Sequence, residues 1–315
     1  MLPVIVIFAP TASGKTALAG ELFGTGGLSL FKETGEVVSA DSQAVYRGFD
    51  IGTAKPDALE KNVIPHHLID IKDPHEQFDV SEFYAMADAA CRKIYARKKF
   101  PLVTGGSGFY IKSFLTWLST APVAKEGVHE KNTELLNKMG SAELHKLLML
   151  LDPLSASRIN PNDAYRIVRA LDVFFSSGKP LSSYEVKSSL RKEYDFLTII
   201  LMREREELYE RINERVEKMF ELGLPEEFER LVKSGCTKET PAMKAIGYAE
   251  FFKREEGLSF DEIKELIKKN TRRYAKKQYS YMKEIPRAHY VKADDRESVF
   301  SLVKDFCLRY RELLS

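Results

Sequence analysis

Residues 4–16 combine the residue types of a phosphate-binding loop. A β-branched run at 4–7 is followed by a loop of small residues, and Gly14, Lys15 and Thr16 then open an apolar stretch with helical character. Between a strand and a helix, backbone N–H groups point at phosphate oxygens and the helix N-terminus adds its positive dipole. Lys15 would neutralise the terminal phosphates, and the Thr16 hydroxyl would hold Mg²⁺ as cofactor.

One position departs from the usual loop pattern, because Ala9 stands where glycine is expected. The strand–loop–helix context and the Gly-Lys-Thr ending remain, so we still expect the loop to bind phosphate groups. An accidental strand-to-helix turn is the alternative.

A second candidate follows the next apolar run. Asp41 comes directly after residues 37–40, at the carboxyl end of an expected strand, where ligands bind in open α/β sheets. The alternative is a helix N-cap, since Asp before Ser42 is also a good cap. The irregular segment 43–56 favours function, because long irregular segments beside a site are usually functional.

The remaining elements alternate in a way that predicts an α/β fold, with a mostly parallel sheet flanked by helices. Apolar runs predict strands at 4–8, 37–40, 67–71, 102–104, 197–202 and 289–291. Periodic patterns predict helices at 15–22, 80–97, 107–118, 205–222, 225–234, 243–254, 260–284 and 296–313. We expect 1–118 and 197–315 to form the core, and 119–196 to be a helical insertion. Residues 24–35 are expected to be a surface excursion.

Composition excludes several classes of protein. The three cysteines, Cys91, Cys236 and Cys307, are far apart, which argues against a disulfide framework and a zinc site. His66 and His67 have no third ligand at a suitable spacing. No apolar run is long enough for a membrane span, so we expect a cytoplasmic protein. The formal net charge is only +2, but residues 264–283 contain eight basic residues and one acid.

Seven motifs together resemble the bacterial type of tRNA dimethylallyltransferase. They are APTASGKT, SADSQAVYRGFDIGTAKP, PHHLIDIKDPHEQFDVSEF, PLVTGGSGFYIKSFL, INPNDAYRIVRALDVF, KAIGYAEF and TRRYAKKQ. They run in order from residue 9 to about 284. The resemblance implies a P-loop NTPase-like fold whose loop holds a diphosphate leaving group. It also implies an insertion domain that contacts tRNA.

The implied reaction moves the dimethylallyl group of dimethylallyl diphosphate to N6 of the adenosine 3′ of the anticodon (position 37). An exocyclic adenine amine is a weak nucleophile, so it requires a base, and Asp41 matches the family's base position. Lys15, the loop N–H groups and Mg²⁺ on Thr16 would stabilise the departing diphosphate. The expected catalytic residues are Asp41, Lys15, Ser107 and Arg211.

Further phosphate ligands are expected outside the loop. Ser107 follows two glycines at a strand-to-helix junction, where the family usually has Thr; a plain N-cap is the alternative. Arg211 and Arg215 lie four apart on one side of a helix, with surface ion pairs to Glu207 or Glu214 as the alternative. The expected diphosphate-binding residues are Ala9, Pro10, Thr11, Ala12, Ser13, Gly14, Lys15, Thr16, Arg211 and Arg215.

The RNA partner is expected to be the anticodon stem–loop, with its target base unstacked to reach Asp41. Tyr248 offers a stacking ring and Gly247 a close approach in this interpretation. The expected tRNA-binding residues are Asp41, Ser42, Gln43, Ala44, Ser107, Arg166, Arg169, Lys244, Gly247, Tyr248, Arg272, Arg273, Lys276, Lys277 and Gln278. A solvated helix face is the alternative for the basic residues of 264–283. The resemblance leaves in doubt whether Gln43 or Ala44 faces the adenine.

Three other functions remain open from the sequence. A P-loop small-molecule kinase would require an arginine-rich lid over ATP, and the insertion has few arginines. An adenylate isopentenyltransferase would not require the basic residues of 264–283. A non-catalytic RNA-binding protein would not require Asp41 beside Lys15. We expect the protein to be a monomer.

Overall fold

The computed structural model describes residues 1–26, 31–184 and 189–313, so residues 27–30 of the expected surface excursion lie outside the described residues. The chain forms two compact units. The first joins Met1–Thr116 to Ser189–Ser315, and the second is Trp117–Ser188. Each unit has its own hydrophobic core.

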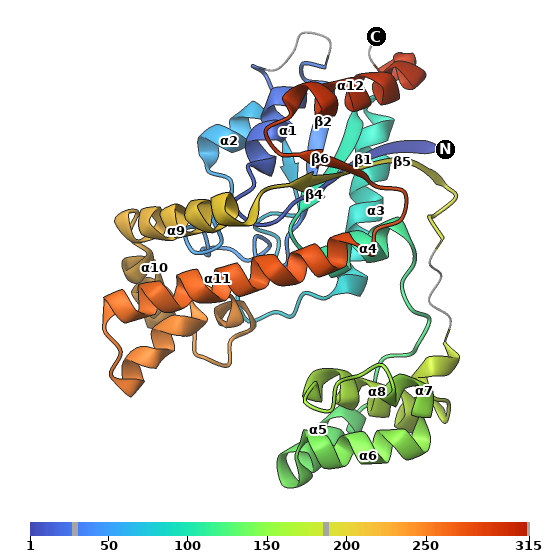
Figure 1. The fold of residues 1–315 in the computed structure, drawn as a ribbon, viewed down its shortest axis with the longest axis vertical. Helices are drawn as coiled ribbons and strands as arrows, with labels where there is room; N and C mark the ends of the chain where they lie inside the picture. The colour runs from blue at the N-terminus through green and yellow to red at the C-terminus, as the bar shows by residue number, and fades with distance from the viewer. Residues whose placement is uncertain (27–30, 185–188, 314–315) are drawn as a thin grey trace. The chain divides into compact units, whose positions relative to one another are not determined.

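The first unit is built on a parallel six-stranded sheet with the order β3-β2-β4-β1-β5-β6 (Figure 1). The strands are β1 Leu2–Phe8, β2 Gly35–Ala40, β3 His66–His67, β4 Phe100–Gly105, β5 Tyr194–Met202 and β6 His289–Lys292. The predicted parallel α/β sheet is therefore confirmed. Because all strands run the same way, the carboxyl ends of β1, β2 and β4 meet at one edge.

Helices cover both faces of this sheet, as the side-chain alternation of β1 requires. Ile5 and Ile7 belong to a core that includes α1 (Lys15–Phe23) and α12 (Arg296–Cys307). Val4, Val6 and Phe8 point to the other face, which is covered by α3 (Val80–Ala96) and α4 (Gly108–Leu115). Strands buried on both faces appear in the sequence as continuous apolar runs, which is why they were predictable.

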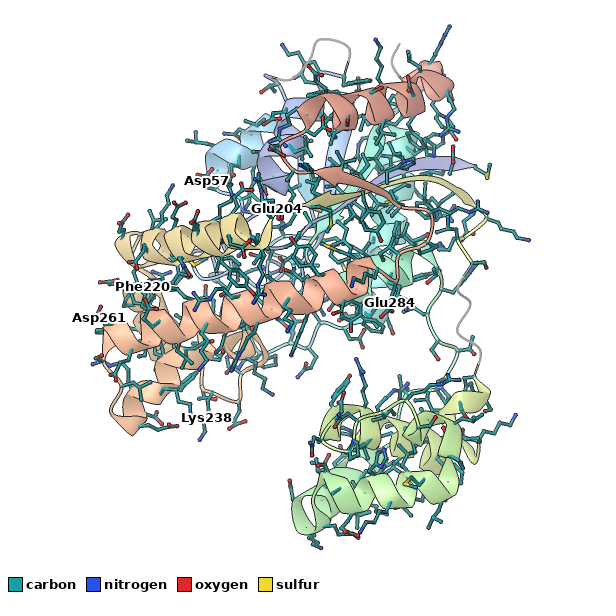
Figure 2. All side chains as sticks on the ribbon, in the orientation of Figure 1. Asp57, Glu204, Phe220, Lys238, Asp261 and Glu284 are labelled. Carbon is teal, nitrogen blue, oxygen red and sulfur yellow. The ribbon has the colours of Figure 1, made fainter. Side chains whose placement is uncertain are left out.

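Two long helices, α9 (Arg205–Glu221) and α11 (Phe260–Met282), pack against each other beyond the sheet (Figure 1). In Figure 2 the labels Glu204 and Phe220 lie at the two ends of α9, and Asp261 and Glu284 lie at the two ends of α11. The short helix α10 (Leu224–Lys233) follows α9. A 3₁₀ segment, Leu308–Leu313, follows α12.

Three sequence predictions of local structure are wrong. The strand expected at 67–71 ends at His67, because Leu68 and Asp70 adopt left-handed backbone angles with φ of 63° and 57°. The helix expected at 243–254 is instead two 3₁₀ segments, Pro241–Lys244 and Ala249–Glu256, interrupted by Gly247 at φ 103°.

The third error is an omission. Helix α2 (Ala58–Val63) was not predicted, although its capping box is visible in the sequence. Asp57, labelled in Figure 2, accepts a hydrogen bond from the Glu60 backbone, and the Glu60 side chain accepts one from the Asp57 backbone. The spacing of Asp57 and Glu60 directly after a proline was the missed signal.

All the regular secondary structure in the described residues of the second unit is helical. Its helices are α5 Val128–Met139, α6 Ser141–Leu151, α7 Pro153–Ala156 and α8 Ala164–Ser177, with a 3₁₀ turn at Leu181–Ser183. The periodic residues Leu144, Leu148, Ile167 and Leu171 form its core.

In the described part of the chain, no helix is long and apolar enough to cross a membrane.

Candidate functional site

The loop after β1 has the backbone of an anion cradle. Ala12 and Gly14 both adopt left-handed angles, with φ of 62° and 83°, and α1 begins at Lys15 immediately after them. Glycine suits this conformation best, so Gly14 fills a backbone requirement. The N–H groups at the start of α1 have no acceptor within the helix, so they can donate hydrogen bonds to an anion.

Ala9 lies at the end of β1 rather than within this turn. Its side chain is fully buried, and its N–H donates to the Gly105 carbonyl at 3.4 Å. Its φ is not positive, whereas those of Ala12 and Gly14 are. The structure therefore shows no backbone requirement for glycine at position 9.

From this backbone we predict that Ala9→Gly changes the Kd for diphosphate by less than about tenfold, since no positive φ is relieved. Isothermal titration of both proteins measures it. A gain of a hundredfold or more would show that the natural loop is impaired.

Lys15 and Thr16 line a cavity of about 370 Å³ at the carboxyl edge of the sheet. Burial and, to a smaller extent, the positive charge of Arg215 lower the pKa of Lys15 to about 8, although the negative charge of Asp41 opposes both. A half-buried lysine beside an arginine is suited to bind an anion, because an anion would offset the repulsion between them.

Asp41 lines the same cavity. Its Oδ1 accepts hydrogen bonds from the backbone N–H groups of Gln43 at 2.8 Å and Ala44 at 3.2 Å. The alternative of a capping role is thus partly right, although the capped segment is a turn and not a helix. Within the described residues no hydrogen bond reaches Oδ2, which leaves that oxygen for a ligand. Gln43 and Ala44 also line the cavity.

Ser107 connects the turn after β2 to the loop after β4. Its Oγ accepts the Ser42 backbone N–H at 3.1 Å, and it makes no side-chain cap to α4. The plain N-cap alternative is therefore not what the structure has. Its hydroxyl proton is left to donate to another acceptor.

The two arginines predicted to bind diphosphate, Arg211 and Arg215, occupy different places on α9. Arg215 lines the cavity and donates to the Thr53 carbonyl at 3.3 Å, whereas Arg211 is exposed and donates to the Ala12 carbonyl at 2.8 Å. Glu207 pairs with Arg203 instead. Arg215 therefore lines the cavity, and Arg211 contacts the backbone of the phosphate loop.

Two buried charged residues, Glu227 and Lys55, stabilise the segment 50–56 beside the cavity. The sequence analysis did not identify either of them. Glu227 is 1% exposed and accepts the backbone N–H groups of 50–52 together with the Tyr248 hydroxyl. Lys55 is bound by Asp50 at 2.7 Å and Asp70 at 2.6 Å. The motif DIGTAKP is therefore folded around an internal carboxylate and an internal ammonium.

Three predicted RNA-binding residues, Tyr248, Gly247 and Gln278, make contacts inside the protein. The ring of Tyr248 is fully buried, so neither face of it is open to a base. A Cβ added at Gly247 would lie 3.2 Å from the Gly52 carbonyl oxygen. Gln278 is 2% exposed; it accepts from Thr11 N–H at 3.0 Å and donates to the Gly106 carbonyl at 2.7 Å. It therefore binds the phosphate loop to the loop after β4.

The other RNA candidates stay predictions. Among the predicted RNA-binding cations of the first unit, four are exposed. Lys244 lines the cavity, and Arg273, Lys276 and Lys277 lie on α11. Arg272 is half-buried and donates to Asn213 at 2.5 Å. In the second unit, Arg166 is exposed beside Asp163, and Arg169 donates to the Ala121 carbonyl at 3.4 Å.

The fold and loop define a P-loop-type protein with an anion cradle and a carboxylate in one cavity. A family model described as IPP transferase matches residues 44–285. The chain is 42% identical over 290 residues to the tRNA dimethylallyltransferase of Geobacter sulfurreducens, covering 91% of both chains. It therefore belongs to the tRNA dimethylallyltransferase family and is a prenyltransferase, as the seven motifs indicated.

Solved structures agree with this assignment. The full-length tRNA isopentenylpyrophosphate transferase of Bacillus halodurans matches with a TM-score of 0.68 and 33% identity, covering 99% of this chain and 97% of that one. A eukaryotic dimethylallyltransferase, solved acting on tRNA, matches with a TM-score of 0.78 and 25% identity, covering 98% of this chain and 78% of that one.

Proposed function

We propose that this protein transfers the dimethylallyl group of dimethylallyl diphosphate to N6 of adenosine 37, next to the anticodon of tRNA, and releases diphosphate. The observation that carries the proposal is that Asp41, Lys15 and Thr16 line one cavity. A base and an anion cradle that share one cavity suit a displacement at a carbon bound between them. All three belong to the first unit of one chain, and we propose a monomeric enzyme that acts in the cytoplasm.

Asp41 is the general base in this mechanism. The lone pair of the adenine amine is delocalised into the ring, so removal of an N6 proton is required as the C–N bond forms. Oδ1 is held by two backbone N–H groups, which leaves Oδ2 to accept that proton. The fixed turn orients the carboxylate before substrate arrives, which is the positioning that such catalysis requires.

The diphosphate leaves with growing negative charge, and the cations near the loop stabilise it. Lys15 and Arg215 line the cavity, so they reach the leaving group directly. Arg211 supports the loop by binding the Ala12 carbonyl. The apolar part of the lining, which includes Val216, Met219 and Ile246, receives the hydrocarbon chain.

Magnesium fits the same cradle. Thr16 lines the cavity and offers a hydroxyl oxygen, and Mg²⁺ typically takes one or two protein oxygens together with substrate phosphates and water. Among the described residues, no cluster of three or more His, Cys, Asp or Glu side chains is arranged for a metal, so the diphosphate would complete the coordination. When bound, Mg²⁺ neutralises charge on the leaving group.

RNA would be held by cations on α11. Lys276 and Lys277 are exposed and have no ion pair within the described residues. Because phosphate contacts release counterions, RNA affinity should fall steeply with salt. The solvated-face alternative predicts no such contribution from these two lysines.

We therefore predict that Lys276→Ala with Lys277→Ala weakens tRNA binding and flattens the slope of log K against log salt by about one to two. The Kd for dimethylallyl diphosphate should not change. Binding titrations at several salt concentrations measure both, and an unchanged slope would support the solvated-face interpretation.

The proposed reaction is tested by incubating the protein with dimethylallyl diphosphate and unmodified tRNA, AMP or ATP in separate reactions. Mass analysis of digested nucleosides should show N6-dimethylallyladenosine only with tRNA. Prenylated AMP would indicate an adenylate isopentenyltransferase, and ADP formation would indicate a kinase. Family membership favours the tRNA reaction over both alternatives.

A further inference from the structure

One face of α11 forms a wall of the cavity. Ile267, Thr271, Tyr274 and Gln278 all line it, at spacings of four, three and four residues. That spacing is the repeat of one helix face. The exposed cations of α11 lie at intervening positions, so the wall and the basic surface are different faces of one helix.

Tyr274 differs from the other members of this wall. Its side chain is 37% exposed, whereas Ile267 is 1% exposed and Gln278 is 2% exposed. A large ring that stays partly open is not explained by core packing. It lies in the cavity wall and on the surface at once, which places it at the mouth of the cavity.

The hydroxyl end of Tyr274 is held while its ring is left open. The hydroxyl donates to the Gly106 carbonyl at 3.4 Å and interacts with the Ser107 side chain. Ser107 in turn accepts the N–H of Ser42, the residue after Asp41. The ring is thereby connected through Ser107 to the turn that carries the proposed base.

The phenol stays neutral at physiological pH. Burial raises the pKa of Tyr274 to about 12, and the negative charge of Asp41 adds to the effect. A neutral phenol does not compete with Asp41 for a proton. What it offers a substrate is the flat face of its ring.

We propose that Tyr274 is the stacking platform for the target adenine, holding the unstacked base so that its N6 amine faces Asp41. The inference rests on the proposed function and adds a positioning residue to it. Bases extruded from nucleic acids are held between aromatic and apolar side chains, and RNA bases that leave their stack are bound on aromatic rings. Ile246 supplies an apolar side chain in the same cavity.

The test compares Tyr274→Leu, which removes the ring, with Tyr274→Phe, which keeps it. The matched control is Tyr290→Leu, since Tyr290 is 52% exposed and its hydroxyl also donates to a backbone carbonyl, but it does not line the cavity. The probe is an anticodon stem–loop with 2-aminopurine in place of the target adenosine. This base fluoresces when unstacked and has no N6 amine to react.

In the complex with the parent protein, 2-aminopurine should be quenched by the ring. With Tyr274→Leu the complex should be several-fold brighter, and kcat/KM for the natural stem–loop should fall by about tenfold or more, the range measured for loss of one base–aromatic stack. Tyr274→Phe and Tyr290→Leu should behave like the parent. The Kd for dimethylallyl diphosphate should be equal in all four proteins, which also shows that they are folded.

Equal quenching in the parent and Tyr274→Leu, with kcat/KM within threefold, would overturn the proposal. If Tyr274→Leu fails to bind dimethylallyl diphosphate, Tyr274→Ala replaces it with the same criteria. Loss of activity in Tyr274→Phe as large as in Tyr274→Leu would assign the effect to the hydroxyl and would also overturn it. Failure of the proposed function itself is seen separately, because the parent would then not prenylate the natural stem–loop.

Discussion

Asp41→Asn is expected to lower the single-turnover rate of prenyl transfer by about 10²–10⁴-fold, the contribution of a positioned general base. Asparagine keeps an oxygen that accepts the N–H groups of Gln43 and Ala44, so the turn is retained while basicity is lost. Asp41→Ala should lose a similar factor in rate. It should also lose about 1 kcal/mol of stability, as when a capping residue is removed.

The structure offers a matched control in Asp79. It caps α3 through the same pattern, accepting the N–H groups of Ser81 at 2.8 Å and Glu82 at 3.0 Å, but it does not line the cavity. Asp79→Asn should therefore leave the rate unchanged. Dimethylallyl diphosphate should bind Asp41→Asn with nearly the parent Kd, since the proposed role of Asp41 is to contact the adenine amine. Turnover of Asp41→Asn within threefold of the parent would reduce Asp41 to a capping residue.

The sheet could be predicted because its physical signal is local. β1 is a continuous apolar run, and Gly14 and Lys15 are adjacent in the sequence. The failure at 67–71 has a local cause that composition does not reveal. Leu68 and Asp70 adopt positive φ, a conformation that Asp tolerates but that leucine does not indicate in advance.

Interior polar contacts could not be predicted, because they join distant parts of the chain. Glu227 receives N–H groups some 175 residues away, and Gln278 receives one from Thr11, 267 residues away. The motif around Tyr248 was assigned to RNA since its residues are polar or aromatic. Its ring and hydroxyl are instead used to hold DIGTAKP against Glu227.

Helical spacing likewise could not distinguish the roles of Arg211 and Arg215 on α9. Arg211 and Arg215 lie on the same side at i and i+4, and the sequence treats them alike. The structure distinguishes them, since only Arg215 lines the cavity. Tyr274 was overlooked for a related reason, because it stands between basic residues that dominated the interpretation of the TRRYAKKQ motif.

Lys15→Met is expected to weaken dimethylallyl diphosphate binding by about 10- to 150-fold at pH 7, the value of a hydrogen bond to a charged group. The rate should fall by about 10²–10³-fold, since Lys15 would also stabilise the charge that develops on leaving.

The pH dependence separates this role of Lys15 from a merely structural one. Burial and the charge of Arg215 lower the Lys15 pKa to about 8, so the free enzyme loses this proton as the pH rises through 8. A bound diphosphate favours the charged form and raises that pKa. Affinity should therefore be constant below about pH 7 and weaken by up to about tenfold per pH unit above 8, because binding then requires proton uptake. In Lys15→Met this weakening should be absent.

Lys244→Met is the matched control, because Lys244 lines the same cavity but is exposed, and it should keep the parent profile. Calorimetric titration from pH 6 to 10 measures all three proteins. A parent profile that is flat through pH 9, or one that Lys15→Met shares, would show that Lys15 does not carry the charge that binds diphosphate.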